Sequence, residues 1–498
     1  MNGRITRVAV AAVVMLGALI VGTTYWQTWA SAGLAARQDN EIQRVAQFTI
    51  RRGTIYANDG TTVLAKNRVV NVGGKTFYYR TYPQRGLTSH VVGYSTIQRS
   101  QSGLESSFND YLTGANGNLS SVFRSTLNSW RGITVTGNDI YTTLNAKAQQ
   151  VALDALKGQC GAAVALNPKT GATLVMASSP TYDPNLVERD FVKIGLTKAS
   201  CSGAAPLLNR ATQGLFTPGS TFKIITAAAA LDTGAFTPDS IFQDPGYCSE
   251  YGKPVYNAGN PDQNGPEAFG RLNLKEGFQH SVNSVFCNIG KKIGASTILR
   301  YAKRFGFYSV PPFDTPLNER APSGLFQGSR LFDPRNANNA VDPGRLAFGQ
   351  ERMLATPLQM AMVAGTVATG GLVVRPYVVS EIVAPNGSVV FKAKPETLGR
   401  AIKPETAKAL NEMMQLVVTG GTGTAAQIPG IKVAGKTGTA ETNVLGRNTT
   451  WFVGFAPADN PRVAFAVVLE NQTGYGGTTA APIAKLILQA LLPSASKP

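Results

Sequence analysis

The sequence predicts a mixed α/β protein of the α+β kind. We expect a central antiparallel sheet flanked by helices, a mixed N-terminal module and one transmembrane helix. Three observations carry this prediction: an uncharged apolar stretch near the N-terminus, an apolar β-hairpin before a long helical region, and a second apolar hairpin after it. Strands at both ends of a helical block favour one sheet assembled from both sides of that block.

Length and charge limit the class of protein. A chain of 498 residues is too long for one typical domain, and 43% hydrophobic with 15% charged residues is ordinary for a globular protein with a core. The net charge of +18 favours an anionic partner. The sequence shows no zinc-finger spacing, no recognition-helix signature and no dense basic run, so we favour a membrane or wall polymer and expect no nucleic acid.

The N-terminal segment predicts a membrane anchor. Residues 8–36 carry no charged side chain, and 8–25 is long enough to span a bilayer. Arg4 and Arg7 precede the stretch, which places a tail of residues 1–7 in the cytoplasm by the positive-inside rule. We therefore expect a transmembrane helix over 8–28, with its outer interface marked by three aromatic residues, Tyr25, Trp26 and Trp29.

A cleaved signal peptide is the alternative for this segment. Residues 8–21 are short enough for its apolar core, and Ala30-Ser31-Ala32 would serve as the cleavage site. We expect the anchor to be retained. Under both interpretations the rest of the chain lies outside, because no later stretch is long and apolar enough to span.

Four cysteines lie in this exported context. An even number allows two disulfides with three possible pairings, and no spacing suits a metal site. From nearness in sequence we predict the pairs Cys160–Cys201 and Cys248–Cys287. The alternative is that some of them are buried free thiols.

Two regions follow the anchor. Residues 29–142 are predicted to form a turn-rich mixed module, with a strand at 91–94 and a short helix from Gly103 to Leu112. Residues 143–498 read as a second domain that opens with a helix over 146–156. In this domain we expect hairpins at 162–177 and 451–469, a largely helical middle over 190–420, and a last helix over 481–492.

The sharpest motif is Thr217-Pro218-Gly219-Ser220-Thr221-Phe222-Lys223. Thr217 is a good N-cap and Pro218 suits the first helical position, so Ser220 falls in a first helical turn with Lys223 on its face. A serine hydroxyl becomes a nucleophile when a base removes its proton, and a lysine is that base if burial and the helix N-terminus keep it neutral. Taken alone, the motif equally suits a capping serine with a solvated lysine.

Two further elements follow in order. Ser281-Val282-Asn283 offers a hydroxyl to relay a proton and an amide to hold a lysine. Lys436-Thr437-Gly438-Thr439 reads as a strand whose lysine and hydroxyls suit a carboxylate. Gly430 with Gly435-Lys436-Thr437 also matches a phosphate-binding loop, but the flanking sequence lacks the strand before it and the helix after it.

Ser-x-x-Lys, Ser-x-Asn and Lys-Thr-Gly in this order form the motif set of penicillin-binding proteins and β-lactamases. The chain resembles the class B penicillin-binding proteins, which are monofunctional transpeptidases, and looks most like their actinobacterial members. Several further stretches support the resemblance: Arg52-Gly53-Thr54-Ile55 with Asp59-Gly60, Gly103-Leu104-Glu105, 163–182, and Gly349-Gln350 with 356–360. The chain departs from the family at Ala57-Asn58, where Asp-Arg is usual.

The resemblance implies a peptidoglycan D,D-transpeptidase that β-lactams inhibit. Ser220 would attack the D-Ala–D-Ala bond of a stem peptide, with Lys223 as the base. Ser281 would pass the proton to the leaving D-Ala, and Asn283 would hold Lys223 and the substrate amide. Lys436, Thr437, Gly438 and Thr439 would bind the terminal carboxylate, and the main-chain N–H groups of Ser220 and Thr439 would form the oxyanion hole. The family also implies no cofactor, and a membrane glycan polymerase of the shape, elongation, division and sporulation type as partner.

Other functions compete with this one. A D,D-carboxypeptidase differs only in using water as the acceptor, and a silent scaffold of the polymerase needs no chemistry. A class A β-lactamase needs a deacylating Glu-x-x-Leu-Asn string, which is absent from the sequence. The two histidines, His90 and His280, invite a Ser-His-Asp triad, but we expect local packing roles for them.

Overall fold

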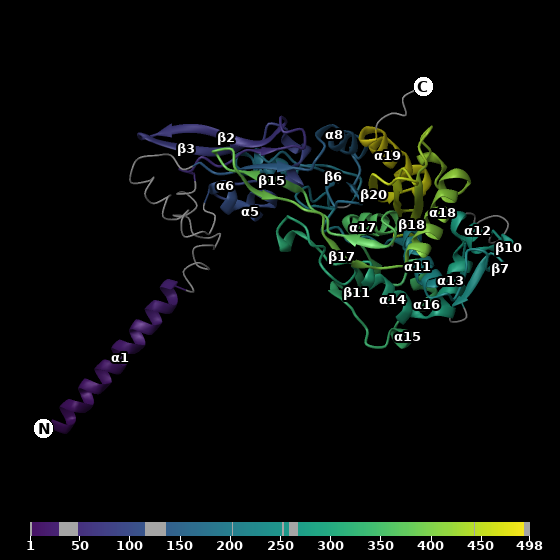
Figure 1. Ribbon diagram of the computed structural model, residues 1–498, viewed down its shortest axis with the longest axis horizontal. Coiled ribbons are helices and arrows are strands. Elements are labelled where there is room, and N and C mark those ends of the chain that lie inside the picture. Colours follow the sequence, from purple (N-terminus) through teal and green to yellow (C-terminus); the bar gives the residue numbers. More distant parts are fainter. Residues whose placement is uncertain are drawn as a thin grey trace.

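The computed structural model describes residues 2–28, 48–114, 136–201, 203–250, 253–257, 267–442 and 444–492. They form an N-terminal helix, a small mixed module and a larger α/β domain (Figure 1). Trp29 and the alternative cleavage site at residues 30–32 lie outside the described residues.

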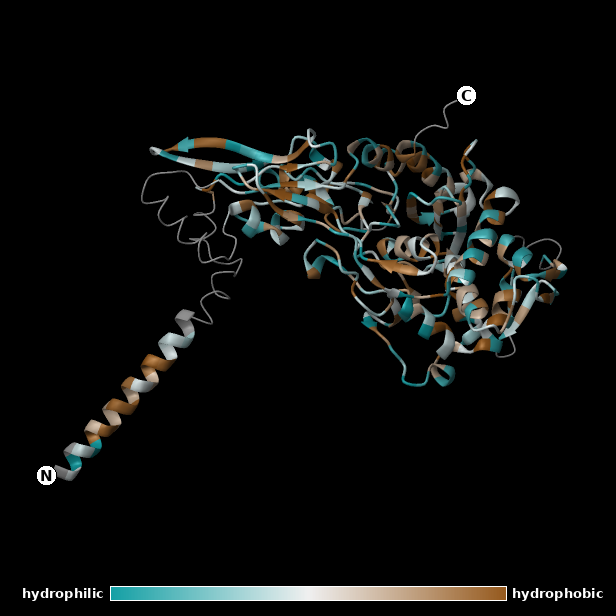
Figure 2. Ribbon diagram, viewed as in Figure 1, coloured by the Kyte–Doolittle hydropathy of each residue, from teal (hydrophilic) through white to brown (hydrophobic). Residues whose placement is uncertain are grey.

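Helix α1 (Asn2–Thr28) contains the expected apolar stretch. Its segment Thr6–Tyr25 has a mean hydropathy of 2.2 and none of it is buried, and no other helix in the described part of the chain is both long and apolar enough to span a membrane. Figure 2 shows the apolar colour along the middle of this helix. The helix is compatible with a membrane anchor, and it begins before the expected residue 8.

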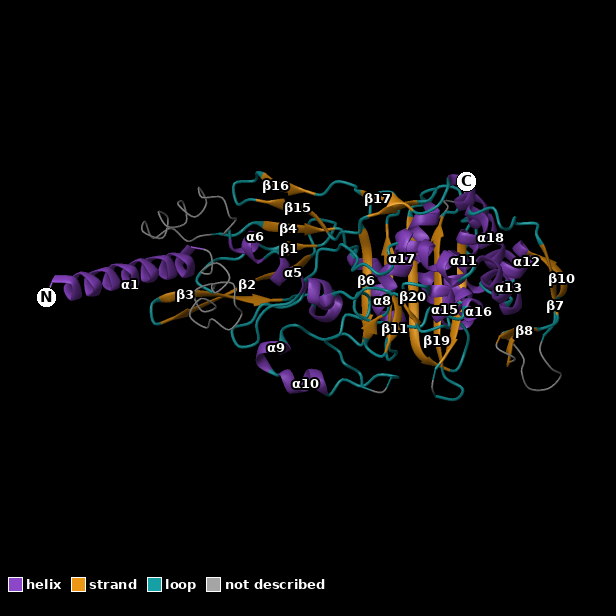
Figure 3. Ribbon diagram, turned by 90° about the horizontal axis from the view of Figure 1, so that it is seen from below, coloured by secondary structure: helices purple, strands orange, loops and turns teal. Residues whose placement is uncertain are grey.

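The N-terminal module is built on a six-stranded sheet of order β16-β15-β4-β1-β2-β3 (Figure 3). Its strands are β1 (Ile55–Tyr56), β2 (Val63–Val72), β3 (Lys75–Thr81), β4 (Asp139–Thr142), β15 (Val379–Val383) and β16 (Val389–Lys392). The last two strands come from far along the chain, and β15 pairs antiparallel with β4. The module is therefore completed by residues beyond the expected segment 29–142.

Three short helices lie between β3 and β4 in the sequence: α4 (Ser89–Val92), α5 (Gly103–Ser107) and α6 (Asn109–Thr113). Helix α6 contacts β4, and α5 contacts both α4 and α6. The short helix expected from Gly103 is confirmed, with a break at Phe108. The strand expected at 91–94 is wrong. Val91 and Val92 both donate to the carbonyl of Thr88 and are buried, so tertiary packing overrides their β-propensity.

A buried carboxylate holds the module together. Glu105 lies 2.9 Å from Arg52 and 2.6 Å from Arg80, and all three side chains are almost completely buried. Arg80 also donates to the carbonyl of Gly53. The chain just before β1, the end of β3 and α5 are thus joined through one acidic side chain.

The larger domain contains an antiparallel sheet of order β18-β19-β20-β5-β6. Its strands are β5 (Gly161–Leu166), β6 (Thr173–Ser179), β18 (Ala434–Glu441), β19 (Asn448–Ala456) and β20 (Val463–Gln472). The structure confirms both expected hairpins and a single sheet assembled from both ends of the domain.

Helices cover both faces of this sheet (Figure 1). The buried helix α17 (Pro357–Ala368) packs on one face, and α8 (Ala146–Ala155) with α19 (Gly476–Leu491) packs on the other. Along β5, Val164 belongs to the core with α17, whereas Ala163 and Ala165 belong to the core with α8 and α19. This alternation is the period of two that a strand between two layers requires. Helix α19 begins five residues before the expected Ala481 and contains Pro482.

The middle of the domain is helical but also contains short strands. The helices are α9 (Leu186–Arg189), α10 (Phe191–Gly195), α11 (Lys223–Asp232), α12 (Leu274–Gln279), α13 (Asn283–Ile293), α14 (Ala295–Arg304), α15 (Ala337–Ala340), α16 (Pro343–Ala347) and α18 (Pro404–Gly420). The strands are β7 (Ile241–Asp244), β8 (Tyr247–Glu250), β9 (Lys253–Tyr256), β10 (Gly270–Asn273), β11 (Gly324–Gln327), β12 (Arg330–Leu331), β13 (Met353–Leu354), β14 (Leu372–Val374) and β17 (Thr397–Arg400).

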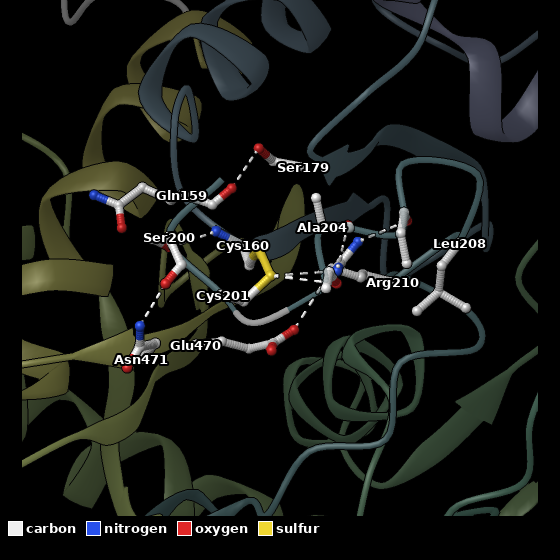
Figure 4. Close-up of a disulfide and its surroundings, with 12 residues drawn as sticks. Gln159, Cys160, Ser179, Ser200, Cys201, Ala204, Leu208, Arg210, Glu470 and Asn471 are labelled. Atoms are coloured by element: carbon white, nitrogen blue, oxygen red, sulfur yellow. Dashed lines mark hydrogen bonds and ion pairs between the residues drawn. A yellow bond between two sulfur atoms is a disulfide. The ribbon is translucent and has the colours of Figure 1, made fainter. Parts of the chain in front are cut away.

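Both predicted disulfides are confirmed. Cys160–Cys201 ties the chain just before β5 to the loop after α10, and the guanidinium of Arg210 lies against it while pairing with Glu470 at 3.2 Å (Figure 4). Cys248–Cys287 ties β8 to α13.

Candidate active site

Ser220 lies in a tight turn in front of α11. The expected α-helical first turn with Thr217 as N-cap is wrong: residues Gly219–Phe222 form a 3₁₀ turn that follows Pro218 and has no side-chain cap. The α-helix begins only at Lys223. The loop before the turn is pinned by Trp451, whose indole N–H donates to the carbonyl of Thr217 at 3.0 Å.

Two glycines let this turn approach strand β18 closely. Gly219 has φ +51°, and a Cβ there would lie 2.8 Å from the carbonyl oxygen of Thr439. A Cβ on Gly438 would lie 2.9 Å from the carbonyl of Pro218. Backbone packed this closely brings the residue after Gly219, which is Ser220, next to Thr439.

Lys223 is completely buried and points at the Ser281-Val282-Asn283 segment. Its Nζ donates to the Asn283 Oδ1 at 2.7 Å, to the Ser281 carbonyl at 2.6 Å and to the Ser281 Oγ at 3.2 Å. The same nitrogen lies 5.2 Å from the centre of the Phe286 ring.

Ser281 and Asn283 occupy the junction between α12 and α13. Ser281 has φ +61°, a conformation that costs energy in a residue other than glycine and is common at functional sites. The Asn283 amide also donates to the carbonyl of Tyr256 at the end of β9. Both polar groups of its side chain are therefore engaged.

A buried carboxylate fixes the start of α13. Asp244, at the end of β7, accepts from the Ser284 hydroxyl at 2.6 Å and from the Asn257 amide at 2.8 Å. The Asn257 Oδ1 in turn accepts from the backbone N–H of Ser284 at 3.1 Å. This network holds the residue next to Asn283.

Lys436 approaches from strand β18. It is completely buried, and its Nζ donates to the Ser281 Oγ at 2.7 Å. Strand β18 continues to Glu441 with no helix after it, which excludes the phosphate-binding loop. The three motifs that lie far apart in the sequence thus meet around one hydroxyl, that of Ser281.

Comparison with known proteins matches this arrangement. Residues 161–489 match the family model of the penicillin binding protein transpeptidase domain, and residues 52–140 match that of the penicillin binding protein A dimerisation domain. The chain belongs to the class B penicillin-binding proteins.

Relatives of this penicillin-binding protein include mycobacterial enzymes. It is 32% identical to the peptidoglycan D,D-transpeptidase PbpA of Mycolicibacterium smegmatis, over 99% of each chain. It is similar in structure to penicillin-binding protein A of M. tuberculosis in a ceftriaxone acyl-enzyme complex, with a TM-score of 0.79, 30% identity and coverage of 90% of this chain and all of the other. A D,D-transpeptidase domain from Eggerthella lenta gives a TM-score of 0.75 and 34% identity, with coverage of 89% and 98%.

A cavity of ≈ 620 Å³ opens in front of the three motifs of the penicillin-binding protein. Of the expected site residues, Ser220, Ser281, Asn283, Thr437 and Thr439 line it, whereas Lys223 and Lys436 lie behind its wall. A ligand in the cavity would therefore meet hydroxyls and amides first, with the positive charge set back.

Sequence reasoning missed part of this lining. Thr422, Thr424, Tyr475 and Thr478 contribute to it, and the Thr422 hydroxyl lies 2.6 Å from that of Thr437. A hydroxyl-rich and glycine-rich string precedes β18 at 420–424, which was the available signal for the first two. Nothing local marked Tyr475 or Thr478, because α19 folds back onto β18 from the end of the chain.

Burial sets the protonation of the two lysines. Desolvation lowers the pKa of Lys223 well below its ordinary value, and the neighbouring charge of Lys436 lowers it further. Desolvation also lowers the pKa of Lys436, to about 7. Burial and the charge of Lys436 therefore both favour loss of a proton from Lys223, which leaves a neutral amine with two N–H groups and one lone pair for its three contacts.

The two histidines make packing and hydrogen-bond contacts, and the cysteines form the two disulfides. His90 is buried with its Nε2 2.7 Å from the Pro206 carbonyl, and burial lowers its pKa to about 4. His280 lines the cavity and stacks on Phe269 at 5.4 Å. Within the described residues, one group has metal-ligand spacing, Cys248, Glu250 and Cys287, and its two sulfurs are bonded to each other.

Proposed function

We propose that this protein is a membrane-anchored peptidoglycan D,D-transpeptidase that works through an acyl-enzyme on Ser220. The observation that carries the proposal is the buried Lys223. Its ammonium form is disfavoured by burial, and it lies one turn from a serine that opens onto the cavity. A neutral amine in that position is a general base for the serine hydroxyl.

The reaction follows from the contacts around Ser281. The Ser220 Oγ attacks the carbonyl of a D-Ala–D-Ala bond as Lys223 takes its proton. Ser281 accepts hydrogen bonds from Lys223 and Lys436, so its own proton can be passed to the leaving amine while it receives one from Lys223. The C–N bond breaks, D-Ala leaves, and the acyl group stays on Ser220. The amine of a neighbouring stem peptide then takes the acyl group, and its proton returns along the same path.

Recognition of the substrate is assigned to strand β18 and to the turn of Ser220. The close approach of Gly219 to Thr439 supports the main-chain N–H groups of Ser220 and Thr439 as the oxyanion hole. Thr437 and Thr439 offer hydroxyls to the terminal carboxylate, and Gly438 lets the turn of Ser220 approach. Lys436 supplies positive charge from behind Ser281.

The PbpA of M. smegmatis is named a peptidoglycan D,D-transpeptidase, and penicillin-binding protein A of M. tuberculosis forms β-lactam acyl-enzymes, which supports the same assignment here. Helix α1, with Arg4 and Arg7 in its first turns, supports a single-pass anchor with the catalytic domain outside the cytoplasm. The resemblance to the class B family implies a membrane glycan polymerase as the partner.

Labelling with a fluorescent penicillin tests the mechanism. We expect one adduct, mapped by mass spectrometry to the peptide containing Ser220, and none in Ser220→Ala. Ser296→Ala on α14, an exposed serine away from the cavity, is the control and keeps full labelling. An adduct on another residue, or one that persists in Ser220→Ala, would refute the mechanism.

The acceptor needs a separate assay. Uncross-linked peptidoglycan polymer is supplied as substrate, and the products are digested and separated. We expect cross-linked dimers, which require an amine acceptor. Release of D-Ala without dimers would identify the D,D-carboxypeptidase, and neither product would favour the silent scaffold.

A further inference from the structure

The two hairpins of the N-terminal module point the same way. Strand β15 runs antiparallel to β4, β4 runs parallel to β1, and β1 runs antiparallel to β2. It follows that β15 and β2 run parallel, so the turns that follow them, at 384–388 and 73–74, lie at the same end of the sheet (Figure 3).

The chain from α1 enters at this end. Strand β1 starts there, and Phe48, the first described residue after α1, lies against the β2–β3 hairpin: its carbonyl accepts from the N–H of Tyr78 at 2.6 Å and its ring lies 5.6 Å from that of Tyr79. The 19 residues between Thr28 and Phe48 span at most about 65 Å. The membrane tether therefore attaches beside this hairpin and not to the catalytic domain.

The free end of the hairpin exposes apolar side chains. Val69 and Val72 are 57% and 59% exposed, and Val70 faces Phe77 across the strands. Figure 2 shows the apolar colour close to the hairpin turn. At the same end of the sheet, β16 exposes Val389, Val390 and Phe391.

The charge of the hairpin has one sign. Residues 63–81 contain four basic and no acidic side chains, Lys66, Arg68, Lys75 and Arg80. Arg80 is buried inside the module, where it pairs with Glu105, and the other three cations are exposed. The Arg68 guanidinium lies over the ring of Tyr79, 5.5 Å from its centre, on the face that also carries Val70, Val72 and Phe77.

Apolar, aromatic and basic side chains together are the composition of a segment that lies in the headgroup layer of an anionic membrane. We propose that the free end of the β2–β3 hairpin, residues 68–79, docks on anionic lipid headgroups and fixes the height and tilt of the catalytic domain above the bilayer. The proposal rests on the membrane anchoring proposed above for α1. The alternative is that the free end of the hairpin contacts a second copy of the chain.

The test uses the full-length protein in lipid nanodiscs. Because all four cysteines are in disulfides, a single introduced cysteine is labelled uniquely. Val72→Cys carries a fluorophore, and lipids with a nitroxide on the headgroup are the quencher. Val192→Cys on α10, which is 73% exposed in the catalytic domain, is the matched control.

We expect strong quenching of the Val72 label in discs containing phosphatidylglycerol, little quenching in phosphatidylcholine discs or at high salt, and none of the Val192 label. Lys75→Gln should lower the docked-to-undocked ratio about fivefold, whereas Lys157→Gln, an exposed lysine on the catalytic domain, should not change it.

Equal quenching of the two labels overturns the proposal. Equal quenching of the Val72 label in phosphatidylglycerol and phosphatidylcholine discs overturns it too. If the Val72 label is shielded from the nitroxide only in discs that hold two copies of the protein, the free end of the hairpin is a dimer interface instead. Protein that does not elute with the discs refutes the anchor itself, so the two failures are told apart.

Discussion

The Nζ of Lys436 lies 2.7 Å from the Oγ of Ser281, which also accepts from Lys223 at 3.2 Å. One hydroxyl thus joins two buried amines, one from the start of α11 and one from strand β18. The charge on one amine disfavours the charge on the other, so the protonation of the pair controls the proposed base.

The pH at which the acylation rate falls on acidification should depend on Lys436. Because the charge of Lys436 helps to lower the pKa of Lys223, Lys436→Met should let that pKa rise. More Lys223 is then protonated at a given pH, and the fall in acylation rate on acidification should move to higher pH. Stopped-flow acylation by a chromogenic cephalosporin across pH gives the profile, and a limb that stays in place or moves to lower pH would contradict the coupling.

Stability should also depend on pH through Lys436. Its pKa is about 7 when folded and 10.5 when unfolded, so between these values the unfolded chain binds more protons and stability rises with pH. One such lysine contributes at most about 1.4 kcal/mol per pH unit. Lys436→Met should remove this contribution to the slope, whereas the contribution of Lys223, whose pKa burial also lowers, remains. Urea denaturation from pH 7 to alkaline pH measures it, and identical slopes in both proteins would show that Lys436 is not buried as described.

Gly219→Ala should damage catalysis more than stability. The new Cβ would meet the carbonyl of Thr439 and push the Ser220 turn off β18, which separates the two proposed oxyanion donors. Loss of one such donor costs about 10²–10³-fold in rate. Gly234 also has a positive φ, +73°, but nothing lies within 4 Å of a Cβ built there, so Gly234→Ala carries a backbone cost of the same kind and should acylate normally. Equal acylation rates in the two variants would count against the oxyanion assignment.

The two disulfides should differ in their effect on activity. Each closes a loop of similar length, with separations of 41 and 39 residues, so each removal should cost about 3–4 kcal/mol in the chain-entropy model. Cys248–Cys287 joins β8 to α13, and the neighbouring β9 supplies the carbonyl that holds Asn283. Serine replacement of this pair should slow acylation about 10-fold to 100-fold.

Serine replacement of Cys160 and Cys201 is the control for that experiment, because this disulfide contacts none of the proposed catalytic residues. The folded double variant should keep its acylation rate. Calorimetry and penicillin labelling of both variants measure the two effects, and an equal loss of activity would point to general unfolding.

Glu105→Gln should destabilise the N-terminal module by about 3–5 kcal/mol, because it leaves Arg52 and Arg80 buried without a counter-charge. Glu381→Gln removes an ion pair of 3.6 Å with the exposed Lys392 and should cost less than about 1 kcal/mol. Calorimetry of the two variants compares the midpoints, and equal midpoints would contradict a structural role for Glu105.

Much of the fold was predictable from local pattern. The two hairpins of the main sheet, the helix over 146–156 and the apolar N-terminal helix follow from periodicity, which is a property of neighbouring residues. The segment 91–94 was not predictable, since its two valines favour a strand and only their burial makes a helix. The addition of β15 and β16 to the N-terminal module was not predictable either. Strand β15 pairs with β4 across more than 200 residues, and such a pairing leaves no local signal in the sequence.

By itself, the sequence determined the motifs, their order and the family they indicate, because these are residue types at fixed short spacings. Only the tertiary structure decided that Ser281 is the meeting point of both lysines, that Ser220 sits on a 3₁₀ turn pressed against β18, and that Thr422 and Tyr475 line the cavity. Hydrogen bonds and desolvation depend on distances of a few ångströms in space, and residues far apart along the chain reach those distances only when the sheet has closed around them.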